Sequence, residues 1–181
     1  MFHSNTDKLI DYWRARKSDR QAPTRAAMDP SDFVDLLTHV FILGRTAPGQ
    51  FSFRLAGGLL TDLHQRDLRR TDFAALWAPA DRIRVAAALE ASRRTVEPLV
   101  LTADARTLEG RTARIEILLA PLRADTLPID RVIGLYQPLS PLVELRREPI
   151  AELGLLRSAS ADDRLGFPAL RLAAVDGQRI A

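Results

Sequence analysis

The side chains best suited to metal or acid–base chemistry are three histidines, which lie far apart along the chain. None of His3, His39 and His64 has metal-ligand spacing to another histidine or to a carboxylate on the same element. The chain contains no cysteine, which excludes disulfides, cysteine-ligated metals and a cysteinyl-flavin adduct. We therefore expect no metal site and no catalytic residue, and the sequence predicts a protein that is not an enzyme.

Clusters of arginine suggest a second kind of chemistry, the binding of an anion such as a cyclic dinucleotide. Arg66 to Arg70 surround Asp67, and Arg16 and Arg20 form a similarly spaced pair. Charge clusters of this size are usually solvated faces. The net charge is only +3 and both signs are mixed along the chain, so we expect no nucleic-acid partner. Gly57-Gly58 lacks the rest of a phosphate-binding fingerprint.

The stretch from Phe51 to Trp77 organises the chain. Phe51, Phe53 and Leu55 alternate with polar residues, as in a half-buried strand. Gly57-Gly58 ends that strand, because glycine turns sharply at little steric cost. Two short helices follow, and Thr71 reads as the N-cap of the second. A strand that leads abruptly into small apolar helices predicts the lip of a pocket against a sheet.

The other elements complete an α+β sheet domain. We expect helices over 6–17, from Asp29 to about Thr38, and over 79–94, with Ile83, Ala87 and Glu90 on one face of the last. Strands are expected over 40–45, from Phe51, and over 96–105, 111–121 and 131–138. The result is a five-stranded antiparallel sheet with short helices and one longer helix on one face, plus an N-terminal helical extension.

Several of these segments resemble the PAS sensory fold, and more narrowly a family of small PAS-like proteins found mainly in alphaproteobacteria. The resemblance is carried by DYWRARKSDRQAPTRAAMDP, FIL at 41–43, FRLAG at 53–57 and LW at 76–77. It covers roughly residues 8 to 140. The sequence departs from the family pattern at Gln65 and Arg70, where glycine is common, and these side chains make the turn less permissive.

The resemblance implies a cup-shaped pocket on one face of the sheet. Its expected lining is apolar apart from one histidine: Phe41, Phe53, Leu55, Leu60, Leu63, His64, Phe73, Trp77, Ile83, Ala87, Ile115, Ile117 and Leu135. His64 stands where an aromatic residue would be expected, and one imidazole suffices as a proximal haem ligand. The ordinary alternative is a histidine bonded to water or backbone, and the aromatic residues could equally be filled core. The cofactor is thus left open.

The N-terminal helix carries an apolar stripe of Leu9, Ile10 and Trp13. The stripe can pack on the helix's own domain, or it can form a dimer seam, because PAS-like domains often associate through such a helix. The resemblance therefore implies a homodimer, and both roles of the stripe stay open.

Three regions divide the chain: a helical extension at 1–38, the PAS-like domain at 39–140, and a tail at 141–181. The tail holds two apolar patches, 150–156 and 165–175, which could be short strands or partly ordered. No apolar run approaches a membrane span and the N-terminus has no signal-peptide core, so we expect no membrane partner and a cytoplasmic location.

Three functions fit these observations. The first is a non-enzymatic sensory module that binds a small ligand or a partner protein and signals through that partner. The second is a structural or adaptor dimer with a filled core and no ligand. The third is a small cone-fold enzyme, which needs an acid–base pair inside the cup, and only His64 is a candidate member.

Overall fold

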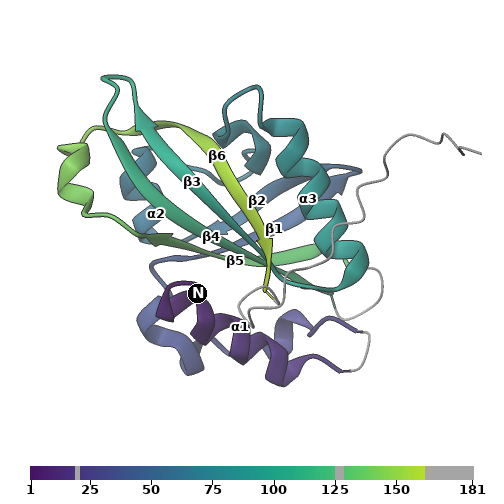
Figure 1. Ribbon diagram of the computed structural model, residues 1–181. Coiled ribbons are helices and arrows are strands. Elements are labelled where there is room, and N and C mark those ends of the chain that lie inside the picture. The colour runs from purple at the N-terminus through teal and green to yellow at the C-terminus, as the bar shows by residue number, and fades with distance from the viewer. Residues whose placement is uncertain (19–20, 125–128, 162–181) are drawn as a thin grey trace, which may run out of the picture.

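The computed structural model describes residues 1–18, 21–124 and 129–161 (Figure 1). Its centre is an antiparallel six-stranded sheet in the order β2-β1-β5-β4-β3-β6. The strands are β1 Val40–Ala47, β2 Gln50–Ala56, β3 Leu99–Thr107, β4 Thr112–Leu122, β5 Arg131–Pro138 and β6 Ile150–Ser160.

Helices cover both faces of the sheet (Figure 1). The first group consists of α1 Ser4–Arg16 and the 3₁₀ helices η1 Arg25–Ala27 and η2 Pro30–Leu36. The second group consists of α2 Gly58–His64, the 3₁₀ helix η3 Phe73–Leu76 and α3 Arg82–Thr95. A further 3₁₀ helix, η4 Leu142–Leu145, precedes β6. Each group buries its own cluster of apolar side chains. We call the face under α2, η3 and α3 the inner face, and the face under α1 and η2 the outer face.

The expected five strands are present, and a sixth joins them. β6 lies antiparallel to β3, from Thr107 opposite Ile150 to Leu99 opposite Ser160. This strand occupies the edge of β3, whose backbone groups would otherwise need another partner. Part of the tail after residue 140 is therefore an edge strand of the sheet, while the second apolar patch, 165–175, lies outside the described residues.

The strand-to-helix turn forms where the glycine pair predicts it. A Cβ at Gly57 would lie 2.3 Å from the carbonyl oxygen of Thr38, so only glycine lets the backbone pass this close. The second short helix is capped one residue later than predicted: Asp72, rather than Thr71, accepts a hydrogen bond from the Ala74 amide. Asp29 caps η2 as predicted, accepting from the Ser31 amide.

The longest helix, α3, presents a different face to the sheet from the one predicted. It starts at Arg82 rather than near Pro79, and Val85, Leu89 and Ser92 are its buried residues. Glu90 lies beside the β1–β2 hairpin, where its carboxylate accepts from Arg45 Nε at 2.7 Å and from the Gly49 amide at 2.9 Å. Burial raises the pKa of Glu90, but these bonds and one from Arg93 outweigh that effect and lower it to about 2.

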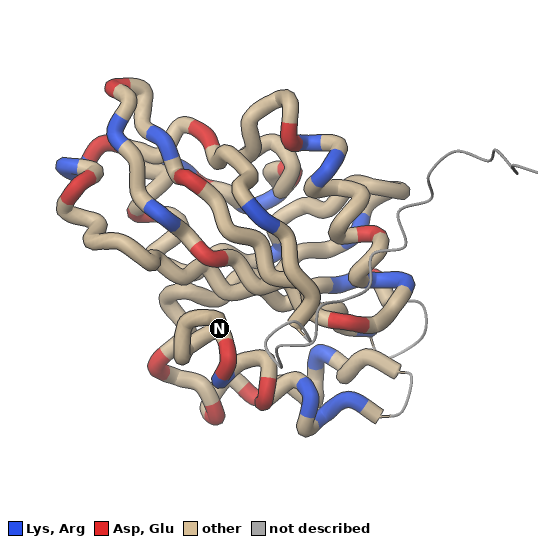
Figure 2. The backbone as a smooth tube through the Cα atoms, viewed as in Figure 1, with Lys and Arg blue, Asp and Glu red and all other residues tan. Residues whose placement is uncertain are grey.

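Charged residues of both signs are interspersed along the described chain (Figure 2). This distribution agrees with the mixed charge pattern of the sequence.

Candidate functional site

The inner face, where the pocket was expected, is packed with aromatic rings. Phe41, Phe53 and Phe73 lie with centroids 5.5 to 5.9 Å apart, and Trp77 packs edge-on to Phe73 at 5.9 Å. All four side chains are at most 1% exposed. Such spacings are ordinary aromatic contacts, so the rings fill this part of the cup.

A glycine in β5 makes room for the innermost ring. A Cβ at Gly134 would lie 2.0 Å from Phe41 Cζ, so the Phe41 ring occupies the space that a side chain would take. The two residues are direct register partners in the β1–β5 ladder. The ring therefore rests directly on the sheet, and the space above the sheet is protein core.

The polar atoms inside this core are few. His64 is 3% exposed, and its Nε2 lies 3.4 Å from the hydroxyl of Tyr136. Burial and the nearby charge of Arg66 lower the pKa of His64 to about 4, against a smaller opposing effect of the Ile150 backbone. Burial also raises the pKa of Tyr136, so both groups are neutral at pH 7. The indole Nε1 of Trp77 is buried without a hydrogen-bond partner.

These residues do not fit a haem. An iron on His64 would need the space in front of a ring nitrogen. The Tyr136 hydroxyl stands before Nε2, and although Nδ1 is buried without a hydrogen-bond partner, the aromatic rings fill the cup where the macrocycle would lie. Among the described residues, His64 has no buried carboxylate as a hydrogen-bond partner, because its Nε2 faces the Tyr136 hydroxyl. The one buried carboxylate in the described part of the chain, that of Glu116, lies on the outer face and accepts from the His3 amide at 2.9 Å.

The predicted pocket residues divide into three groups. Those on the inner face are Phe41, Phe53, Leu60, Leu63, His64, Phe73, Trp77, Ile115 and Ile117. Leu135 is fully buried but belongs to the outer cluster, because it alternates with Tyr136 along β5. Leu55, Ile83 and Ala87 were predicted wrongly, since all three are exposed.

Each error has a local cause. The β1–β2 pairing slips between Ile42 and Leu43, a bulge that breaks the alternation and leaves Leu55 47% exposed. Ile83 and Ala87 follow the same helical spacing as Val85 and Leu89 but lie on the opposite stripe of α3.

The proposed seam residues are covered by their own chain. Leu9, Ile10 and Trp13 are each 0% exposed and pack in the outer cluster. The indole Nε1 of Trp13 donates to the carbonyl of Pro121 at 2.7 Å, which attaches α1 to the end of β4. The stripe thus packs on its own domain, and it offers no surface to a second copy.

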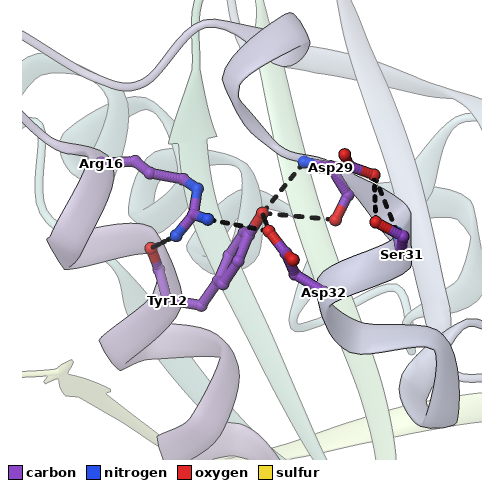
Figure 3. Close-up of polar contacts among 5 residues, drawn as sticks. All are labelled: Tyr12, Arg16, Asp29, Ser31 and Asp32. Carbon is purple, nitrogen blue, oxygen red and sulfur yellow. Dashed lines mark hydrogen bonds and ion pairs between the residues drawn. The ribbon is translucent and has the colours of Figure 1, made fainter.

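In the motif DYW…MDP, the side chain of Tyr12 joins α1 to η2 on the outer face (Figure 3). The Tyr12 hydroxyl accepts from the Asp29 amide at 3.0 Å and donates to Asp32 Oδ2 at 2.8 Å. Arg16 donates to the same Asp32 oxygen at 2.9 Å, and its guanidinium stacks over the Tyr12 ring. These contacts fasten α1 to η2, so the motif residues are explained by the architecture of the extension.

The two predicted arginine clusters have different surroundings. Asp67 is paired with Arg69 at 3.0 Å in an exposed turn, as on an ordinary solvated face. Arg16 belongs to the Tyr12 contacts, and Arg20 lies outside the described residues. Among the residues that the structure describes, no group of three histidine, aspartate or glutamate side chains could hold a metal ion.

An antiparallel sheet whose inner face carries two short helices and one longer helix defines an α+β domain of the PAS type. The chain belongs to the PAS domain family: the sequence model of that family matches residues 1–137. No curated protein matches the sequence.

Solved structures similar to this chain include light-oxygen-voltage domains. One, described with a flavin analogue, is 12% identical, with a TM-score of 0.49 over 64% of this chain and 87% of that one. The Rhodobacter sphaeroides LOV protein is 12% identical, with a TM-score of 0.47 over 66% and 82%. The dark structure of Aureochrome1 LOV is 12% identical to this chain, with a TM-score of 0.47, and the match covers 71% of this chain and 92% of that one.

No helix in the described part of the chain is long and apolar enough to cross a membrane.

Proposed function

We propose that this chain is a non-enzymatic, cytoplasmic regulatory module that works by binding a partner protein, with a filled core in place of an internal ligand. One observation carries the proposal: the rings of Phe41, Phe53, Phe73 and Trp77 occupy the inner cup in mutual contact. Membership of the PAS family supports a sensory or regulatory role. A module with a packed cup must receive and pass on its signal at its surface.

The arrangement around His64 supports a non-catalytic role. General acid–base catalysis needs a titratable pair within hydrogen-bond reach of a substrate. Here the imidazole is 3% exposed and faces a tyrosine hydroxyl, so the pair has neither a carboxylate nor access to solvent.

The test compares the mass of the freshly purified protein under native and denaturing conditions. We expect the native mass to equal that of the bare chain or of a whole number of chains. Extra mass that is lost on denaturation would overturn the filled-core proposal and identify the protein as a sensor of an internal ligand. The same spectrum gives the oligomeric state, and a dimer would have to use residues other than the buried Leu9, Ile10 and Trp13.

A further inference from the structure

Two adjoining hollows lie on the outer face, where η1 and η2 meet β1 and β2. They share Arg25, Ala26, Ile42 and Leu55 as lining residues. The first, about 450 Å³, has a mainly apolar lining completed by Met28, Asp29, Pro30, Phe33, Leu37, Val40, Leu122 and Ile133. The second, about 470 Å³, is completed by Arg54, Ala124 and Arg131. We call the two together the outer groove.

The bulge in β2 builds this groove. It exposes Leu55 beside its register partner Ile42, and both residues line the two hollows. The side chain of Arg54 lies across Gly44 of β1, since a Cβ there would be 2.5 Å from Arg54 Nε. On the other side of β1, in β5, Arg131 is the register partner of Gly44. The two strands that flank Gly44, which has no side chain, therefore each contribute one arginine.

The arginines of the outer groove have little internal compensation. Neither Arg25 nor Arg54 has a carboxylate within ion-pair distance among the described residues, and Arg131 faces only its neighbour Asp130 at 3.9 Å. Arginines elsewhere, such as Arg111 and Arg114, make bonds of 2.7 to 2.8 Å to carboxylates.

Two acidic side chains of the described residues, Asp29 and Asp130, lie in or next to the lining of the outer groove, and both accept hydrogen bonds within the chain. Asp29 accepts from the amide and hydroxyl of Ser31, and Asp130 accepts from the Ala124 amide at 3.2 Å. A groove with an apolar part and a basic part whose arginines have little internal compensation complements a ligand that is apolar at one end and anionic at the other.

We propose that the outer groove binds a short acidic segment of a partner protein, which places a large apolar side chain beside Phe33, Leu37 and Leu55 and its carboxylates beside Arg25, Arg54 and Arg131. This inference rests on the proposed function, since it names the surface and the chemistry of the partner. Arginine suits the role because its planar fork binds carboxylates in pairs of hydrogen bonds. An apolar anchor in a groove supplies most of the binding energy in such interfaces.

The experiment selects binders for the full chain from a displayed library of random short peptides. We expect the enriched peptides to combine acidic residues with leucine or an aromatic residue, and their binding to weaken as salt is raised. The double substitution Arg25→Glu with Arg54→Glu should lower affinity at least tenfold. The control Arg157→Glu changes an exposed strand arginine of β6, remote from the groove lining and without an ion pair among the described residues, and should bind as the wild type does.

A matched pair of leucines tests the apolar end. Leu55 and Leu156 are 47% and 45% exposed, and both lie at bulges in edge strands. Leu55→Asp should abolish peptide binding, whereas Leu156→Asp should leave it intact. Urea midpoints equal to that of the wild type establish that each variant is folded.

Other outcomes overturn the inference. Enriched peptides that lack acidic residues, or that bind the Arg25→Glu and Arg54→Glu variant as tightly as the wild type, remove the outer groove as the site while leaving partner binding in place. A library that yields no binder, or a groove that takes dodecanoate but no peptide, also removes it. Failure of the proposed function is separate, because it appears as a bound small molecule in the native mass.

Discussion

Trp13 links the N-terminal helix to the sheet through one buried hydrogen bond. Trp13→Phe removes the donor to the Pro121 carbonyl and leaves a small void, so we expect a loss of about 2 kcal/mol in the free energy of unfolding. Urea unfolding followed by circular dichroism measures this loss.

The other tryptophan is the natural control. Trp77 is equally buried, but its Nε1 has no partner, so Trp77→Phe removes an unpaired donor along with ring volume. Its cost should be smaller by about 1 kcal/mol. If Trp13→Phe instead dissociates an oligomer and leaves the stability of the chain unchanged, Trp13 belongs to a subunit seam.

His64 should make the fold sensitive to mild acid. Its pKa is about 4 in the folded chain and 6.5 in the absence of structure, so the unfolded state binds more protons between these values. Stability is therefore lost as the pH falls from 6.5 towards 4, by about 2 kcal/mol between pH 7 and pH 5 for this residue. His64→Phe removes the effect.

The measurement compares urea unfolding of the wild type and His64→Phe at pH 7 and pH 5. The stability difference between the two proteins should grow in favour of the variant at the lower pH. Equal differences at both pH values would show that the imidazole is not buried as described.

Among the elements, β6 permits a test of its register. Leu153 lies opposite Ala105 and is 0% exposed, whereas Leu156 falls at the pairing shift between Arg157 and Leu155 and is 45% exposed. Leu153→Ala should cost about 3 kcal/mol, as for buried leucines in general, and Leu156→Ala should cost less than about 0.5 kcal/mol. The unfolding midpoints of the two variants in urea measure these losses. A larger loss for Leu156→Ala than for Leu153→Ala would mean that the strand is shifted by one residue.

The sequence predicted the elements better than their partners. Alternation revealed β2 and β4, and the caps and glycines marked the ends of η2 and β2, because these signals are local. Residues 150–156 form a strand because they pair with the free edge of β3, and a pairing between distant segments leaves no local pattern in the sequence. Leu55 was placed on the wrong face because a bulge reverses the alternation of a strand and has no signature in this sequence. Ile83 was placed wrongly because α3 has two apolar stripes with the same spacing.

The same limit applies to the candidate site. Nine of the thirteen predicted pocket residues share the inner face, because resemblance and periodicity together identified it. Whether Phe41, Phe73 and Trp77 enclose a cavity depends on volumes that only the assembled core determines. The outer groove was missed because it joins the extension, β1 and β2, segments whose proximity follows from the fold.

At the scale of the whole molecule, the sheet is shared by two cores, and each holds one of the two tryptophans. Trp13 reports the outer cluster and Trp77 the inner cluster. β4 and β5 contribute side chains to both cores, such as Ile117 and Leu118 of β4, so we expect the two cores to unfold together.

In Trp77→Phe the fluorescence comes from Trp13 alone, and in Trp13→Phe from Trp77 alone. Within each variant, the fluorescence and circular dichroism transitions should coincide. A Trp13 transition that precedes the loss of circular dichroism would instead show that the N-terminal extension detaches first, and would make the outer layer a separately folding unit.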